Sequence, residues 1–100
     1  MQTLEIEKLF SSYGRTKVLT IMLESGELNI SEITRRSGLS HSSAAKHLEF
    51  LVGAGLLSEK RFNRIRIFKV DYSNPLVSVL NRLLSDWNRV SPLAVERSLG

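Results

Sequence analysis

Cysteine is absent from this chain of 100 residues. Its absence excludes disulfides, thiolate metal sites, thiol catalysis and cysteine-based redox sensing. Long apolar runs are missing too: the longest stretch without charged or strongly polar residues is Phe50–Leu57, whereas a bilayer-spanning helix needs about 20 residues. Glu5 and Glu7 stand where a signal peptide would be basic. We therefore expect a cytoplasmic protein.

Groups for enzymatic chemistry are also scarce. His41 and His47 are six residues apart, which places them on different faces of one predicted helix, so the two together make a poor metal site. No nucleophile has a base and an orienting acid in a recognisable pattern. Gly53-Ala54-Gly55 ends a predicted helix and does not open one, as a phosphate-binding loop would. The sequence predicts neither an enzyme nor a metal or cofactor site.

Basic residues are present in excess and are unevenly distributed. Fourteen Lys and Arg against ten Asp and Glu give a net charge of +4. The 35 residues from Arg35 to Lys69 hold eight basic and two acidic side chains, a net charge of +6, so the rest of the chain is net −2. A basic segment in mildly acidic surroundings indicates a polyanionic partner, although a solvated surface face is the simpler alternative.

Length and composition predict one domain over residues 1–100. Apolar spacing and turn residues divide it into N-terminal helices within 1–25, a helix-turn-helix at 31–54, a β-wing at 56–70 and a C-terminal helix at 74–90. The expected fold class is therefore mainly α with a small β-wing: a winged helix-turn-helix with N- and C-terminal dimerisation helices.

The helix-turn-helix prediction depends on the turn before the second helix. Gly38 can adopt a positive φ at the end of the first helix, which Ser31 is expected to cap. Leu39 can fill the space between the helices, and Ser40 can cap the second. The second helix turns Ala44, Leu48, Leu51 and Val52 inward.

Other local signals place a short strand at Leu28–Ile30 and a helix from Arg15. Asn63-Arg64 suits a tight hairpin turn. Asn74-Pro75 suits a helix start, and Ser91-Pro92 is expected to stop that helix.

The C-terminal helix carries an apolar seam with alternating intervals of four and three residues, which is typical of a short coiled coil. Such a seam needs a partner surface, and a second copy of the chain is the preferred one. The seam consists of Leu76, Leu80, Leu83, Trp87 and Val90, widened by Val77 and Leu84.

These features together resemble a known family. Residues 33–57, ITRRSGLSHSSAAKHLEFLVGAGLL, look like the winged-helix core of ArsR-type transcriptional regulators, with MarR-type and related archaeal regulators close behind. The matching pieces are Gly38-Leu39-Ser40, His47-Leu48, Leu51, Ala54-Gly55-Leu56 and the upstream GRTKVLTIML. The resemblance covers about residues 4 to 90 and implies a homodimer on double-stranded DNA. It also implies that the first helix, with Leu4 and Leu9, joins the last helix at the dimer interface.

One departure from the family pattern affects the expected function. Metal-sensing members carry a cysteine pair near the recognition helix, or an Asp/His set on the terminal helix. This chain has no cysteine, and its terminal helix has Asp86 but no histidine. The resemblance therefore does not extend to metal sensing.

Two groups of residues are candidates for DNA contact. The second helix of the motif would offer small hydroxyls, an imidazole, a methyl group and an ammonium to bases or adjacent phosphates: Ser40, His41, Ser42, Ser43, Ala45 and Lys46. The wing and the first helix of the motif would contact the DNA backbone through Arg35, Arg36, Lys60, Arg61, Asn63, Arg64 and Arg66. Entry of Arg64 into the minor groove is an alternative to a phosphate contact, and the structural alternative for the wing is an edge hairpin whose charges prevent aggregation. His47 and Phe50 are interpreted as structural.

The predicted function is sequence-specific binding of double-stranded DNA as a homodimer that regulates transcription, with repression preferred over activation, in the cytoplasm and associated with the nucleoid. Two alternatives stay open at this point. One is a sequence-tolerant architectural DNA-binding protein of the chromosome, and the other is a winged helix that binds an acidic protein partner.

Overall fold

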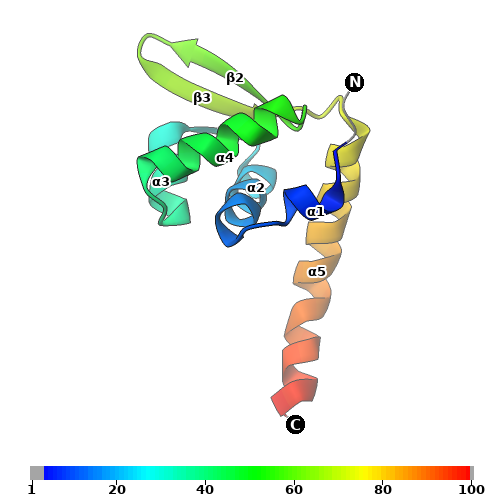
Figure 1. Ribbon diagram of the computed structural model, residues 1–100. Helices are drawn as coiled ribbons and strands as arrows, with labels where there is room; N and C mark the ends of the chain where they lie inside the picture. Colours follow the sequence, from blue (N-terminus) through cyan, green and yellow to red (C-terminus); the bar gives the residue numbers. More distant parts are fainter. Residues whose placement is uncertain (1–3, 100) are drawn as a thin grey trace.

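The computed structural model describes residues 4–99, with side chains described as far as Pro92. Its elements (Figure 1) are α1 (Ile6–Leu9), α2 (Tyr13–Ser25), β1 (Glu27–Asn29), α3 (Ile30–Ser37), α4 (His41–Gly53), β2 (Leu57–Phe62), β3 (Ile65–Val70) and α5 (Pro75–Leu99). The mainly helical fold with a small antiparallel sheet is the predicted winged helix-turn-helix.

The hydrophobic core lies between α2, α3, α4 and the base of the hairpin. Helical spacing puts one apolar stripe of each helix on this side, and β3 adds an aromatic ring from the sheet. The side chains with no more than 2% of their surface exposed include Val18, Leu19, Met22, Ile33, Leu48, Leu51 and Phe68. Of the positions predicted to face inward on α4, Ala44, Leu48 and Leu51 are buried, and Val52 is half-buried.

The sheet has the strand order β1-β3-β2, with both neighbouring pairs antiparallel. β2 and β3 form the wing, a hairpin that lies beside α4 at the edge of the domain (Figure 1). Their turn is made by Asn63, at a φ of 57°, and Arg64. An asparagine tolerates this left-handed conformation better than most residues, which explains why the hairpin turns at the predicted place.

The start of α3 corrects the sequence prediction. Asn29, not Ser31, is the N-cap, because the Oδ1 of Asn29 accepts a hydrogen bond of 2.8 Å from the backbone N–H of Glu32. The short strand therefore ends at Asn29, and Ile30, predicted as strand, is the first residue of the helix. Either residue type can cap a helix, so the sequence alone could not choose between them.

The starts of the other helices agree more closely with prediction. Ser40 caps α4 by accepting a hydrogen bond of 3.2 Å from the backbone N–H of Ser43. Asn74 precedes Pro75 at the start of α5, and its Oδ1 accepts from the backbone N–H of Leu76 at 2.9 Å. α2 begins two residues before the predicted Arg15, because Ser12 supplies its cap.

The end of α5 also differs from prediction. Ser91-Pro92 does not stop the helix, which continues through Pro92 to Leu99. Proline removes one backbone N–H and crowds the carbonyl four residues earlier, but the hydrogen bonds on both sides of it can still form. In Figure 1, α5 runs away from the rest of the domain to the C-terminus.

Within residues 4–99, no helix combines the length and the apolar character that crossing a membrane requires.

Candidate nucleic-acid interface

The N-terminus of α4 gathers polar groups on the surface of the domain. The Ser40 Oγ lies 3.3 Å from the Ser42 Oγ and donates a hydrogen bond of 3.0 Å to the Ser43 Oγ. His41, Ser42 and Lys46 are exposed, and Ser43 is half-buried. The positive end of the helix dipole lies at the same place and favours anions. Small hydroxyls, an imidazole and an ammonium thus lie together on the surface at the start of α4.

Packing on the opposite side of α4 determines which side chains face outward. Ala44, Leu48 and Leu51 are fully buried, so the rotation of the helix about its own axis is restricted. Lys46, two residues after Ala44, consequently points to solvent, and no ion pair joins it to any residue whose side chain is described. Ala45 is half-buried and packs partly against the core, which limits its exposed methyl surface.

α4 also packs closely against the beginning of α2. Gly14 is buried, and a Cβ atom added to it would lie 2.8 Å from Nε2 of His47. Burial, together with the positive charge of Arg15, lowers the pKa of His47 below its usual range. The Arg15 guanidinium lies 3.6 Å from the centre of the Phe50 ring. His47 and Phe50 therefore serve the helix–helix contact, in line with their structural interpretation.

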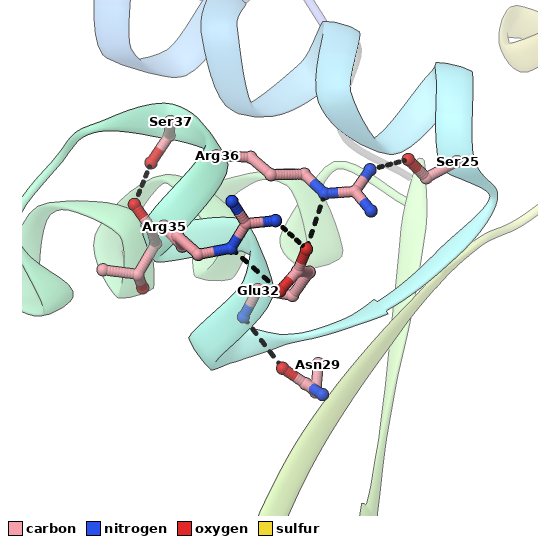
Figure 2. A network of polar contacts seen from close by, with 7 residues as sticks. Ser25, Asn29, Glu32, Arg35, Arg36 and Ser37 are labelled. Atoms are coloured by element: carbon pink, nitrogen blue, oxygen red, sulfur yellow. Dashed lines mark hydrogen bonds and ion pairs between the residues drawn. The ribbon is translucent and has the colours of Figure 1, made fainter.

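The arginines of α3 are already bonded to a carboxylate (Figure 2). The Arg35 Nε donates to the Glu32 Oε2 at 3.2 Å, and the Arg36 Nε donates to the Glu32 Oε1 at 2.9 Å. Arg36 also reaches α2, where its Nη1 donates to the Ser25 Oγ at 3.0 Å. Hydrogen bonds from Arg35 and then Arg36 lower the pKa of Glu32 to about 2. The carboxylate thus stays ionised at neutral pH and competes with any phosphate for both predicted contact residues.

Arg66, a predicted DNA-contact residue, is partly buried and paired with a carboxylate. Its side chain is only 20% exposed and donates to the Glu59 carboxylate at 2.7 and 3.1 Å. These hydrogen bonds lower the pKa of Glu59 below its usual range. The Arg66 guanidinium also lies 5.3 Å from the centre of the Phe68 ring. Arg66 lies on the core-facing side of the hairpin, where alternation along β3 places it with Phe68. A contact between Arg66 and DNA stays a prediction, and it would require the guanidinium to leave the Glu59 carboxylate.

The remaining wing cations are exposed. Lys60 pairs with Glu27 at 3.1 Å, and Arg61 lies 3.8 Å from Glu59; both cations keep more than half of their side-chain surface exposed. Surface pairs of this kind contribute little and exchange readily. Asn63 and Arg64 form the exposed turn, and no ion pair of Arg64 occurs among the described side chains. Arg64 is therefore the predicted wing residue most available to a phosphate.

The candidate dimer residues divide into two groups. Leu9, 3% exposed, belongs to the core of its own chain, because α1 packs it inward, and Leu4 packs partly against that core. By contrast, four positions of the predicted seam on α5 keep between 43% and 67% of their surface exposed: Leu76, Leu83, Trp87 and Val90. The seam residue Leu80 is 8% exposed.

An apolar groove of about 490 Å³ lies between α2 and α5. Its lining comes from the end of α1, the outer side of α2 and the middle of α5. The lining residues are Phe10, Thr16, Leu19, Thr20, Leu23, Leu80, Leu83, Leu84 and Trp87. Leu80 thus faces this groove, and Leu84 and Trp87 border it.

Two functional features escaped sequence reasoning. Glu32 precedes Arg35 and Arg36 by three and four residues, a spacing that brings helix side chains together, so this clamp could have been found. The Glu59–Arg66 pair needs the hairpin register, in which Arg61 faces Arg66 and Glu59 is the diagonal neighbour. The register follows once the turn is placed at Asn63-Arg64.

Comparison with known proteins gives a family match. Residues 12–59 match the family model described as "Bacterial regulatory protein, arsR family". This segment runs from the cap of α2 through α3 and α4 into β2. No curated protein matches the chain.

Solved structures share the fold. One is described as the predicted DNA-binding transcriptional regulator from E. coli, at 25% identity and a TM-score of 0.66 over 81% of this chain and 83% of that chain. The AntR antimony-specific transcriptional repressor aligns at 16% identity and a TM-score of 0.71 over 86% of this chain and 76% of that chain. Sso10a-2, a DNA-binding protein from Sulfolobus solfataricus, aligns at 17% identity and a TM-score of 0.58 over 87% and 92% of the two chains.

Proposed function

Because residues 12–59 are those of an arsR-family bacterial regulatory protein, we propose that this chain binds a specific double-stranded DNA sequence as a homodimer and represses transcription. The fold and the family are those of DNA-binding transcriptional regulators, which are not enzymes. A protein with this function works on the chromosome, in the cytoplasm.

The observation that carries the proposal is the position of the free polar groups. Ser42 and Lys46 are exposed at the start of a helix whose other side is locked into the core. In a helix-turn-helix, the N-terminal residues of the second helix reach base edges in the major groove. Ser42, Ser43 and Lys46 then meet bases or adjacent phosphates, His41 a phosphate or a purine edge, and the half-buried Ala45 a thymine methyl group. Arg64 lies on the flanking DNA backbone.

The homodimer is supported by the unpartnered apolar surface of α5. Leu83 and Trp87 are about half and two-thirds exposed, next to the groove against α2. Large exposed apolar patches mark interaction sites, and α5 extends beyond its own domain (Figure 1). A second copy of the chain can cover the exposed side chains of α5 and the adjacent groove. Two-fold symmetry then predicts an inverted repeat with half-sites about 34 Å, or one helical turn, apart.

Repression follows from the mode of binding. A dimer that covers two successive major grooves excludes other proteins from the same stretch of DNA. The AntR structure, which has the same fold, is named a transcriptional repressor.

The first test is selection from a random pool of double-stranded DNA at about 0.15 M salt. We expect enrichment of an inverted repeat. Retention of DNA without enrichment would replace the proposal by the architectural alternative, and no retention would replace it by a protein partner. If the dimer neutralises roughly 6–10 phosphates, its affinity falls by about 10³–10⁵ between 50 and 200 mM salt.

The dimer is tested separately, by analytical ultracentrifugation of matched variants. Trp87→Asp places a charge in the exposed apolar surface of α5, whereas Asn88→Asp places the same charge on the neighbouring exposed residue. We expect the first variant to sediment as a monomer and the second as a dimer. A dimer in both variants would move the interface away from α5.

A further inference from the structure

The tip of the wing exposes two large apolar side chains. Phe62 is the last residue of β2 and Ile65 the first of β3, with 67% and 49% of their surfaces exposed. The two residues are directly opposite each other in the antiparallel register, so their side chains share one face of the hairpin. The turn at Asn63-Arg64 connects them and keeps them together at the end of the wing.

The core of this chain does not cover these side chains. The core lies on the other face of the hairpin, where Leu57 and Phe68 are buried. β1 pairs with β3 only as far as Ile67, so the third strand of the sheet ends before the tip. As a cross-strand pair the two side chains stabilise the hairpin modestly. Among the described residues, no other element covers Phe62 or Ile65, so most of the Phe62 surface and about half of the Ile65 surface stay exposed.

The charge around this pair indicates the nature of its partner. Between Lys60 and Arg66 the chain has four basic residues and no acidic one. Arg61 is 66% exposed, and Arg64 forms the turn between the two apolar residues. An apolar pair bordered by cations complements a surface that is itself apolar and bordered by anions. The faces of two neighbouring bases, which become accessible when a base step opens between the two phosphate backbones, are such a surface.

From this juxtaposition we propose that the wing tip enters the minor groove and inserts Phe62, supported by Ile65, between two base pairs, thereby kinking the DNA. The proposal rests on the proposed function, because α4 in the major groove is what brings the wing to the adjacent minor groove. Apolar side chains that insert in this way partly unstack the base step and bend the duplex by about 20–90° toward the major groove.

The chemistry of the wedge predicts which base steps it uses. Pyrimidine–purine steps unstack most readily, whereas A-tracts are stiff. Phe62 therefore adds an indirect preference for a flexible step beneath the wing, at a position where no side chain reads a base edge. Arg61 and Arg64 hold the flanking phosphates while the ring displaces one base from its neighbour.

The test uses the duplex enriched by the selection, or a mixed-sequence duplex if none is enriched. Dyes at the two ends report bending by energy transfer, and the fluorescent adenine analogue aminopurine beneath the wing reports unstacking. We expect the wild-type protein to bend the duplex and to raise the aminopurine signal. Phe62→Ala removes both effects and weakens binding by about tenfold for each of the two wings of the dimer, the scale of one lost stacking contact per wing. Phe62→Leu, which keeps an apolar wedge, retains most of the bend.

Tyr72→Ala is the matched control, because Tyr72 is a 61% exposed aromatic residue at the opposite end of the hairpin. This variant should bend DNA like the wild type. Wild-type binding without a bend, or a bend that Phe62→Ala leaves unchanged, would overturn the wedge and leave the proposed function intact. Failure of the wild type to bind any duplex would overturn both.

Discussion

Two contrasting groups of cations occur within the basic segment, and the charge count does not distinguish them. Lys46 and Arg64 point to solvent and have no ion pair among the described side chains. Arg35 and Arg36 share the carboxylate of Glu32, and Arg66 is in contact with Glu59. The first group can meet a phosphate at once, whereas the second must first leave a carboxylate. Net charge thus locates the proposed DNA-facing surface, but pairing determines which cations on that surface are free.

The sharpest test of this comparison is the removal of a free cation. Lys46→Ala should weaken binding to the selected duplex by about tenfold to a hundredfold, because a dimer loses two ammonium groups at or near base edges. It should also relax the sequence preference, as measured by a repeat selection with the variant. Arg82→Ala, an exposed cation on α5, is the control and should bind like the wild type.

Arg64→Ala should weaken binding to all duplexes about equally, because a phosphate contact carries no sequence information. The slope of log affinity against log salt should fall by about two for a dimer, one for each arginine. Titrations at several salt concentrations measure this slope. A selective loss at one base position would contradict the backbone role of Arg64.

Arg66→Ala should act on stability instead of DNA binding. The change leaves the carboxylate of Glu59, 23% exposed, without its main partner, which should lower the free energy of unfolding by about 1–2 kcal/mol. Urea denaturation measures this free energy, and the salt slope of DNA binding should stay unchanged. A reduced slope in a folded variant would show that Arg66 leaves Glu59 for a phosphate.

Glu32→Gln should have a smaller and opposite effect on binding. Without the carboxylate, Arg35 and Arg36 become available to phosphates, so duplex affinity should rise about threefold, in line with the modest strength of exposed pairs. Glu24→Gln, an exposed carboxylate on α2 with no ion pair among the described side chains, is the control. A fall in affinity would indicate that Glu32 positions the two arginines for binding.

The smallest effect concerns the packing of α2 against α4. The folded-state pKa of His47 lies below the usual 6.5, so the unfolded chain binds this proton more readily. The contribution of His47 to the free energy of unfolding should therefore be constant above about pH 7, decrease as the pH falls through 6.5, and level off below the folded-state pKa of His47. Thermal unfolding at several pH values checks this, with His47→Gln losing the dependence and His41→Gln keeping it.

The clearest local signals in the sequence located most of the elements. Gly38, at a φ of 70°, and the Ser40 cap define the turn of the motif, because few residue types suit these positions. Asn63 marked the hairpin for the same reason. The prediction was wrong at the start of α3, where both Asn29 and Ser31 suit the role of N-cap. It was also wrong at Pro92, where the helix continues instead of ending.

The sequence by itself thus determined the fold class, the basic segment and the polar side of α4, because these depend on periodicity and on residue types with narrow conformational preferences. The tertiary structure showed which cations are free, although the spacing of Glu32, Arg35 and Arg36 already indicates one of the pairings. The pairing of Arg66 with Glu59 could have been derived from the predicted turn, because the turn sets the strand register. By contrast, the burial of Leu9 and Leu80 depends on how α1 and α5 pack against the core. Such contacts join residues from different elements, and local sequence carries little information about them.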